Sequence, residues 1–188
     1  REQYISFAKE SIEVAKQLHC RCLVIHSNAL DKNGIVLNQY EAINSSKKIQ
    51  NMVDTLKILA PLAKKADVTL VLEALNTKVD HAGYFLNHTE DAIRVVELVG
   101  SPNVKILYDI YHMQIMEGNL INTIKKYIDL IGHIHIADVP GRHEPETGEI
   151  NFKNIIGTLK SLNYKGAIGF ELYPLHSSQE ALEVIKVL

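Results

Sequence analysis

The stretch "DVTLVLEALN", residues 67–76, is an almost continuous apolar run that ends in a carboxylate at Glu73. Near-continuous hydrophobicity predicts a strand of a parallel sheet, because both faces of such a strand are covered. The same layout recurs in four other segments: "RCLVIHSN" (21–28), "NVKILYDIYH" (103–112), "GHIHIADVPG" (132–141) and "KGAIGFELYP" (165–174). The sequence therefore predicts five parallel strands.

Amphipathic helical patterns lie before, between and after these runs. They predict helices at 2–18, 41–65, 90–99, 119–131, 152–162 and 178–188. In the third, Thr89 is the expected N-cap and Gly100 the expected C-cap. Strands that alternate with helices predict βαβ units. No glycine-rich phosphate loop follows a strand, which argues against a dinucleotide-binding open sheet.

The predicted architecture is α/β, a (β/α)8 barrel of the TIM type. Five units do not close an eight-stranded barrel. The chain opens at Arg1 inside one helical pattern and stops at Leu188 inside another. We therefore expect residues 1–188 to be a single domain that lacks about three N-terminal βα units and is poorly active alone. A natural half-barrel, the alternative, would leave parallel sheet edges open to association.

Composition excludes several classes of partner. The net charge is −2, and basic residues are scattered among acidic ones, so no nucleic-acid surface is expected. The longest apolar stretches have the length of strands, so no membrane span is predicted. Cys20 and Cys22 do not form a disulfide framework or a zinc-site spacing. We expect both to be reduced core thiols of a cytoplasmic protein.

Ligand-type side chains end four of the five predicted strands. Because side chains alternate along a strand, Ala167, Gly169 and Glu171 share one face, which suits the barrel interior. The same alternation brings three further residues to this rim: Glu73, Asp109 and His135. Active sites of TIM barrels lie at the C-terminal rim of the strands. The four side chains are therefore predicted to converge there.

Three carboxylates and one imidazole at one point would repel and desolvate one another unless a cation held them. The set suits a hard divalent ion, Mn²⁺ or Mg²⁺, with Co²⁺ as a further option, and its lack of thiolates argues against structural zinc. Each residue alone has a simpler interpretation. A strand-end glutamate is more often a salt-bridge partner, and His133 is more often a hydrogen-bonded core residue.

Around these residues the chain resembles the hydroxypyruvate isomerase family, within the xylose isomerase-like (sugar isomerase/epimerase) TIM-barrel superfamily. The matching stretches are "LEALNT" (72–77), "YFLNHTEDA" (84–92), "YDIYHMQIMEGNL" (108–120), "GHIHIADVPGRHEPETGEINF" (132–152) and "LNYKGAIGFELYP" (162–174). The resemblance implies that the chain supplies strands four to eight of that barrel.

The resemblance also implies roles for individual residues. The implied ligands of a divalent metal are Glu73, Asp109, His135 and Glu171, and both glutamates are implied to transfer protons. His112 is implied to contact the substrate and Arg142 to hold it. The implied reaction is an aldose-ketose type isomerisation of a small hydroxy-carbonyl substrate, hydroxypyruvate, to tartronate semialdehyde through an enediolate. Asn76 and Gln114 are interpreted as hydrogen-bonding loop residues.

Two departures from the family pattern leave the identity of the substrate open. Many hydroxypyruvate isomerases have glutamine where His135 stands, whereas ketose 3-epimerases have histidine. Leu172 and Tyr173 follow Glu171 where tyrosine and a basic residue are typical. A ketose 3-epimerase or an inosose isomerase is therefore the alternative, with a sugar as substrate.

Arg142, the enzyme class and the mode of assembly each allow a second interpretation. Arg142 could be a solvated loop charge beside Glu144 and Glu149. A phosphodiester hydrolase would need a basic nucleic-acid surface, which the composition does not offer. A non-catalytic barrel fragment would bind another chain through open edges. The loops 28–40 and 139–151 could serve as lids or as contacts in a homo-oligomer.

Overall fold

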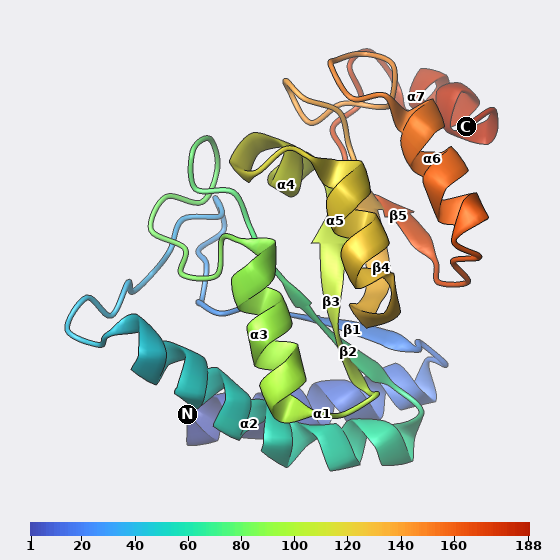
Figure 1. Ribbon diagram of the computed structural model, residues 1–188. Coiled ribbons are helices and arrows are strands. Elements are labelled where there is room, and N and C mark those ends of the chain that lie inside the picture. Colours follow the sequence, from blue (N-terminus) through green and yellow to red (C-terminus); the bar gives the residue numbers. More distant parts are fainter.

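The computed structural model describes all residues, 1–188, and contains one five-stranded sheet. Its strands are β1 (Cys22–Ile25), β2 (Thr69–Glu73), β3 (Val104–Asp109), β4 (Ile131–Ile136) and β5 (Ile168–Phe170). Each strand pairs in parallel with the next in the chain, in the order β1-β2-β3-β4-β5. The sheet curls like part of a barrel wall (Figure 1). The prediction of five parallel strands is confirmed.

Helices cover the outer face of this sheet. They are α1 (Glu2–Gln17), α2 (Ser45–Ala66), α3 (Thr89–Val99), α4 (Ile110–Met116), α5 (Leu120–Tyr127), α6 (Phe152–Ser161) and α7 (Ser178–Lys186), with a 3-10 turn at Ile128–Leu130. In Figure 1, α1 and α2 lie side by side below the sheet and α3 stands beside α2. None of the helices is both long enough and apolar enough to cross a lipid bilayer.

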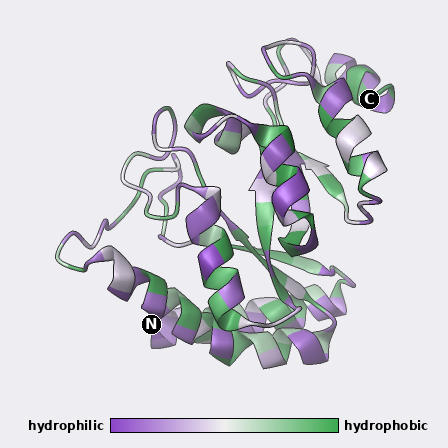
Figure 2. Cartoon of the chain, in the orientation of Figure 1, coloured by the Kyte–Doolittle hydropathy of each residue, from purple (hydrophilic) through white to green (hydrophobic).

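The hydrophobic core lies between the sheet and the helices. It combines strand residues such as Leu70, Leu72 and Ile106 with helix residues such as Leu59 and Val96, all of them buried. In Figure 2 the strands are mostly hydrophobic, whereas the helices carry both hydrophobic and hydrophilic residues. Burying a side chain of this size contributes roughly 1.5–3 kcal/mol. The sheet is thereby fixed as the platform for the strand-end residues.

Two local predictions were wrong at the ends of elements. The run 103–112 was predicted as one strand, but β3 stops at Asp109 and a helix, α4, follows at once. The Asp109 carboxylate accepts a hydrogen bond from the backbone N–H of His112 and so caps α4. Thr89 is not the N-cap of α3 but its first residue, because the Glu117 carboxylate accepts hydrogen bonds from its N–H and hydroxyl.

Gly100 is confirmed as the C-cap of α3, with a left-handed φ of 67°. The cysteines differ from their prediction. Both are free, but Cys20 is exposed and Cys22 only half-buried. The reason is that Cys22 opens β1, an edge strand of the sheet, so neither thiol lies in the core.

The loop after β4 is anchored by one buried carboxylate. Asp138 accepts three hydrogen bonds, from the backbone N–H groups of Val139, Gly148 and Ile150. Replacing Asp138 with alanine would leave these donors unpaired, so we expect the free energy of unfolding to fall by about 3 kcal/mol. Urea unfolding followed by circular dichroism would measure it. Replacing the exposed Asp129 should change it by less than about 0.5 kcal/mol, and equal effects would contradict the anchoring role.

Candidate metal centre

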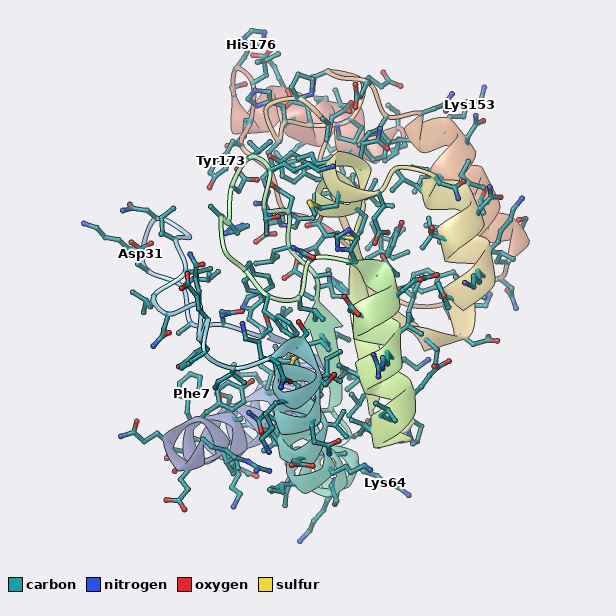
Figure 3. The ribbon with its side chains drawn as sticks, turned by 60° about the vertical axis from the view of Figure 1, so that its left-hand side comes forward. Phe7, Asp31, Lys64, Lys153, Tyr173 and His176 are labelled. Atoms are coloured by element: carbon teal, nitrogen blue, oxygen red, sulfur yellow. The ribbon has the colours of Figure 1, made fainter.

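Four ligand-type side chains converge where strands β2 to β5 end. Each offers one ligand atom, and these atoms all lie within 4.8 Å of one another: Glu73, Asp109, His135 and Glu171. Glu73 and Asp109 are the last residues of β2 and β3, and Glu171 directly follows β5. The loops of this rim gather at the end of the molecule that carries Tyr173, whereas Lys64 lies at the opposite end (Figure 3). The structure thus brings together the four residues predicted as ligands.

His135 lies at the middle of the cluster. Its Nδ1 is 3.7 Å from Glu73 Oε1 and 3.8 Å from Asp109 Oδ2. The same atom is 3.4 Å from Glu171 Oε2. Three carboxylates from three other segments therefore surround one imidazole nitrogen.

Two atoms of the cluster are buried without any hydrogen-bond partner. They are Glu73 Oε1 and His135 Nδ1, which face each other. Buried polar atoms in proteins almost always have a partner, so two such atoms aimed at one point need an explanation. A divalent cation bound between them would satisfy both, and a set of three carboxylates and one imidazole fits a hard ion. The residues present therefore fit a metal ion.

Burial and mutual charge shift the pKa values of the cluster side chains, so protons compete with a metal ion for the same atoms. Burial raises the pKa of Asp109 to about 7, and the charge of Glu73 adds to this effect. Burial would lower the pKa of His135, but the carboxylates of Glu171 and Glu73 raise it to about 10. Burial would likewise raise the pKa of Glu73, but the imidazoles of His135 and His26 lower it to about 2. The surrounding carboxylates therefore favour the protonated form of His135.

Metal binding should release protons, because a ligand binds metal only in its deprotonated form. Because the pKa values of His135 and Asp109 are raised, both side chains hold protons that a metal ion must displace. Since a raised pKa means that the group holds its proton until a higher pH, we expect Mn²⁺ affinity to rise by about tenfold or more per pH unit from 6 to 8. Calorimetric titration in buffers of different ionisation enthalpy measures this. An affinity that is constant over this range would contradict it.

His26 was missed by the sequence analysis. It directly follows β1, and its Nε2 lies 3.0 Å from Glu73 Oε2. The signal was available, because His26 alternates with Cys22 and Val24 and so faces the same rim as the other ligand-type residues. It was overlooked because the first strand ends in "HSN" and carries no carboxylate.

His112 is buried next to the cluster. Its Nδ1 accepts a hydrogen bond from the backbone N–H of Asn76, so its proton must sit on Nε2, 3.8 Å from Asp109 Oδ2. Burial and then the charge of Arg142 lower the pKa of His112 to about 3, which keeps it a neutral donor. Asn76 makes the predicted loop hydrogen bond, to Asp80. Gln114 donates to Glu149, but its prediction as a loop residue is wrong, because it lies in helix α4.

Arg142 reaches into the same rim. Its guanidinium NH2 lies 2.5 Å from Glu171 Oε2 and 3.8 Å from Asp109 Oδ2, and it stacks 5.0 Å above the ring of Tyr111. Only 14% of the side chain is exposed. The alternative of a solvated charge beside Glu144 and Glu149 is therefore wrong. The Glu144 carboxylate instead accepts a hydrogen bond from the backbone of Leu175.

A second group of ligand-type residues, Asp80, His81 and His112, is explained by hydrogen bonds. Asp80 accepts from Asn76 and from the hydroxyl of Tyr111. His81 Nδ1 bonds the carbonyl of Gly34, and His112 Nδ1 is already occupied. These contacts hold the loop after β2 in place.

His133 differs from its prediction as a hydrogen-bonded core residue. It is half-buried on the inner face of the sheet, its side chain makes no hydrogen bond, and its ring lies 5.0 Å from that of His135. Gly169 faces both rings. A Cβ there would lie 2.9 Å from His135 Cδ2 and 3.1 Å from His133 Nε2, so only glycine fits beside the cluster.

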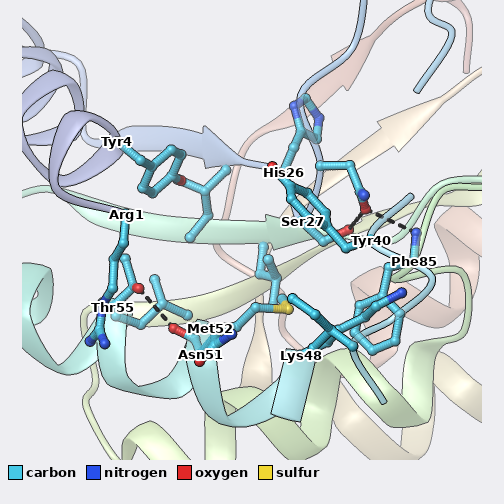
Figure 4. Close-up of a pocket in the computed structure, with 15 residues that line it drawn as sticks. Arg1, Tyr4, His26, Ser27, Tyr40, Lys48, Asn51, Met52, Thr55 and Phe85 are labelled. Atoms are coloured by element: carbon cyan, nitrogen blue, oxygen red, sulfur yellow. Dashed lines mark hydrogen bonds between the residues drawn. The ribbon is translucent and has the colours of Figure 1, made fainter. Parts of the chain in front are cut away.

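A cavity of about 350 Å³ lies on the helix side of β1 and β2 (Figure 4). Apolar side chains such as Ile25, Met52 and Leu72 line it, and His26 lies at its edge. None of the four cluster residues lines this cavity. The cluster itself lies on the other, concave face of the sheet.

The whole chain, residues 1–188, matches the sequence model of the family described as xylose isomerase-like TIM barrel. The chain belongs to this family. It is 40% identical over 139 residues to hydroxypyruvate isomerase from Escherichia coli K12, which covers 73% of this chain and 54% of that protein. It is 39% identical over 134 residues to 2-oxo-tetronate isomerase from Cupriavidus necator, which covers 71% of this chain and 51% of that protein. The chain thus spans about half the length of the curated relatives it matches.

One solved structure agrees with this chain over its full length. The crystal structure of an AP endonuclease, family 2, from Brucella melitensis superimposes with a TM-score of 0.86 at 30% identity. The match covers 100% of this chain and 69% of that one. The predicted TIM-barrel fold class and the predicted resemblance to the hydroxypyruvate isomerases are confirmed.

Proposed function

We propose that the protein carrying this chain is an isomerase that converts hydroxypyruvate to tartronate semialdehyde by proton transfer. One observation carries the proposal: two glutamates, an aspartate and a histidine converge beside a sheltered arginine. The relatives from E. coli and C. necator support it, because hydroxypyruvate and 2-oxo-tetronate both carry a carboxylate next to a carbonyl. A sheltered guanidinium suits such a substrate.

Four residues would hold a divalent metal ion, proposed to be Mn²⁺ or Mg²⁺, with Co²⁺ as a further option: Glu73, Asp109, His135 and Glu171. Bound there, the ion would polarise the substrate carbonyl and stabilise the negative charge of the enediolate. The unpartnered atoms of Glu73 and His135 support this assignment.

The chemical step needs a proton to leave C3 and another to reach C2. One glutamate takes the proton as the C3–H bond breaks, and the electron pair forms the C2–C3 double bond of the enediolate. A proton is then delivered to C2, while the proton of the C3 hydroxyl passes to the C2 oxygen. Glu73 and Glu171 are proposed for the transfers at carbon, because they approach the cluster from β2 and from β5.

His112 and Arg142 are proposed to bind the substrate. The Nε2 proton of His112 points toward Asp109 and the cluster, so it is placed to donate to a substrate oxygen. Arg142 would bind the substrate carboxylate through two parallel hydrogen bonds. In the structure its guanidinium pairs with the Glu171 carboxylate, which shows that this place accepts a carboxylate.

A ketose 3-epimerase or inosose isomerase is the second candidate, and the presence of His135 in the cluster favours it. In that reaction the proton would return to the opposite face of the carbon from which it came, again using two glutamates. A neutral sugar has no carboxylate, so Arg142 would contribute little to its binding.

The experiment that tests the proposal compares hydroxypyruvate with D-fructose and D-tagatose as substrates. Each is assayed with EDTA and again with Mn²⁺ restored. The proposal expects metal-dependent turnover of hydroxypyruvate alone. Turnover of a ketose alone would establish the second candidate, and activity that survives EDTA would overturn the metal centre.

The domain organisation and the mode of assembly are proposed as well. We infer that residues 1–188 form one domain equivalent to strands four to eight of the barrel, which the unbroken pairing of β1 to β5 supports. A non-catalytic chain that associates through its open edges is the distant alternative. Native mass measurement with the activity assay separates them, because an active monomer would rule out that alternative.

A further inference from the structure

We propose that His26 is a positioning residue that fixes the orientation of Glu73 in the metal centre. The inference rests on the proposed function, because it deepens the description of that same site. It concerns a residue outside the four cluster ligands and outside the pair proposed to bind the substrate.

The hydrogen bond from His26 gives the two carboxylate oxygens of Glu73 different surroundings. Oε2 accepts a hydrogen bond from His26 Nε2 at 3.0 Å, whereas Oε1 faces His135 Nδ1 at 3.7 Å without a partner. The Glu73 side chain is only 5% exposed, so solvent competes little with His26 for Oε2 in the intact protein. With Oε2 held, rotation of the carboxylate is blocked and Oε1 stays aimed at the cluster.

The backbone around His26 is fixed to the strand that carries Glu73. The hydroxyl of Tyr84 accepts a hydrogen bond from the N–H of Ser27 and donates to the carbonyl of Glu73. The ring of Tyr84 also packs edge-on against that of His26, with centroids 6.2 Å apart. One tyrosine thus ties the ends of β1 and β2 together and supports the imidazole from the side.

The two glutamates of the cluster are held by different means. Glu171 is 56% exposed and is paired with Arg142. Glu73 is buried, and His26 is the one side chain that hydrogen-bonds its carboxylate. Partners of this kind orient metal ligands, and their removal typically weakens metal affinity by about 10–100-fold.

The test measures Mn²⁺ affinity by calorimetry in the absence of substrate. His26→Phe keeps a flat ring against Tyr84 but has no N–H to donate, so we expect Mn²⁺ to bind about 10–100-fold more weakly. His26→Gln keeps an N–H donor at a similar reach and should recover most of that loss. His176→Ala removes an exposed histidine outside the site and should leave the affinity unchanged.

Each result decides between the proposals. A loss in His26→Phe that His26→Gln restores supports the positioning role, provided that urea unfolding shows both variants folded. If His26→Phe is unfolded, the comparison of His26→Gln with His26→Ala replaces it. Equal affinity in wild type and the donor-free variant would overturn the role of His26 alone. A wild type that binds no Mn²⁺ would overturn the metal centre and this inference together.

Discussion

Replacing Glu171 with glutamine is expected to lower the turnover of hydroxypyruvate by about 1,000-fold, because general acid–base groups contribute about 10²–10⁴ in rate. Glutamine has nearly the same shape but cannot accept a proton from carbon. The side chain is 56% exposed and its ion pair with Arg142 lies at the rim, so the free energy of unfolding should fall by less than about 1 kcal/mol. Steady-state kinetics and urea unfolding measure the two quantities.

Exchange of the substrate C–H in deuterated water sharpens this test. If Glu171 removes the proton, the variant should show almost no exchange. Substantial residual exchange would show that another group, such as Glu73, removes it, and would contradict this role of Glu171. Glu10→Gln, an exposed substitution on α1, is the matched control and should behave like the wild type.

Replacing Arg142 with alanine is expected to raise KM for hydroxypyruvate by about 100-fold, since charge-assisted hydrogen bonds contribute roughly 1.5–3 kcal/mol. The effect should be large because the guanidinium is sheltered between Tyr111 and the cluster, where water competes little. Arg142→Lys should recover only part of the loss, because an ammonium cannot bind a carboxylate through two parallel bonds.

The control for this prediction is Arg94→Ala, which removes an exposed guanidinium from α3. It should leave KM within about twofold of the wild type. An unchanged KM in Arg142→Ala would argue against a bound carboxylate. Together with measurable turnover of a ketose, it would favour the epimerase candidate.

The sequence was sufficient to predict the parallel sheet and the convergence of the four cluster residues. Strand runs that are apolar on both faces determine parallel strands, and alternation by two then determines which side chains share a rim. Glu73, Asp109 and His135 lie at the ends of such runs, so their convergence follows from pattern alone. The solvent exposure of the cluster side chains was harder to predict. Glu171 follows an edge strand, and its side chain is 56% exposed.

Contacts between distant segments could not be predicted. The pairing of His26 with Glu73 joins residues 47 apart in the chain, and the capping of Thr89 by Glu117 joins residues 28 apart. Helix α4 was missed because its first residues, Ile110 and Tyr111, continue the apolar run of β3, and periodicity cannot separate a buried strand from a buried helix over so few residues. For His26 and for the start of α3 a tertiary contact decided the local structure, whereas α4 begins at a local cap by Asp109.

The order of the sheet has a consequence for how the protein assembles during synthesis. Because every strand pairs with its predecessor in the chain, the sheet can grow in the order in which the ribosome delivers it. The cluster cannot, since its first residue, Glu73, ends β2 and its last, Glu171, follows β5. A nascent chain that has reached Gly169 holds three of the four cluster residues. The complete site proposed for a metal ion would therefore form only after the last strand has been synthesised.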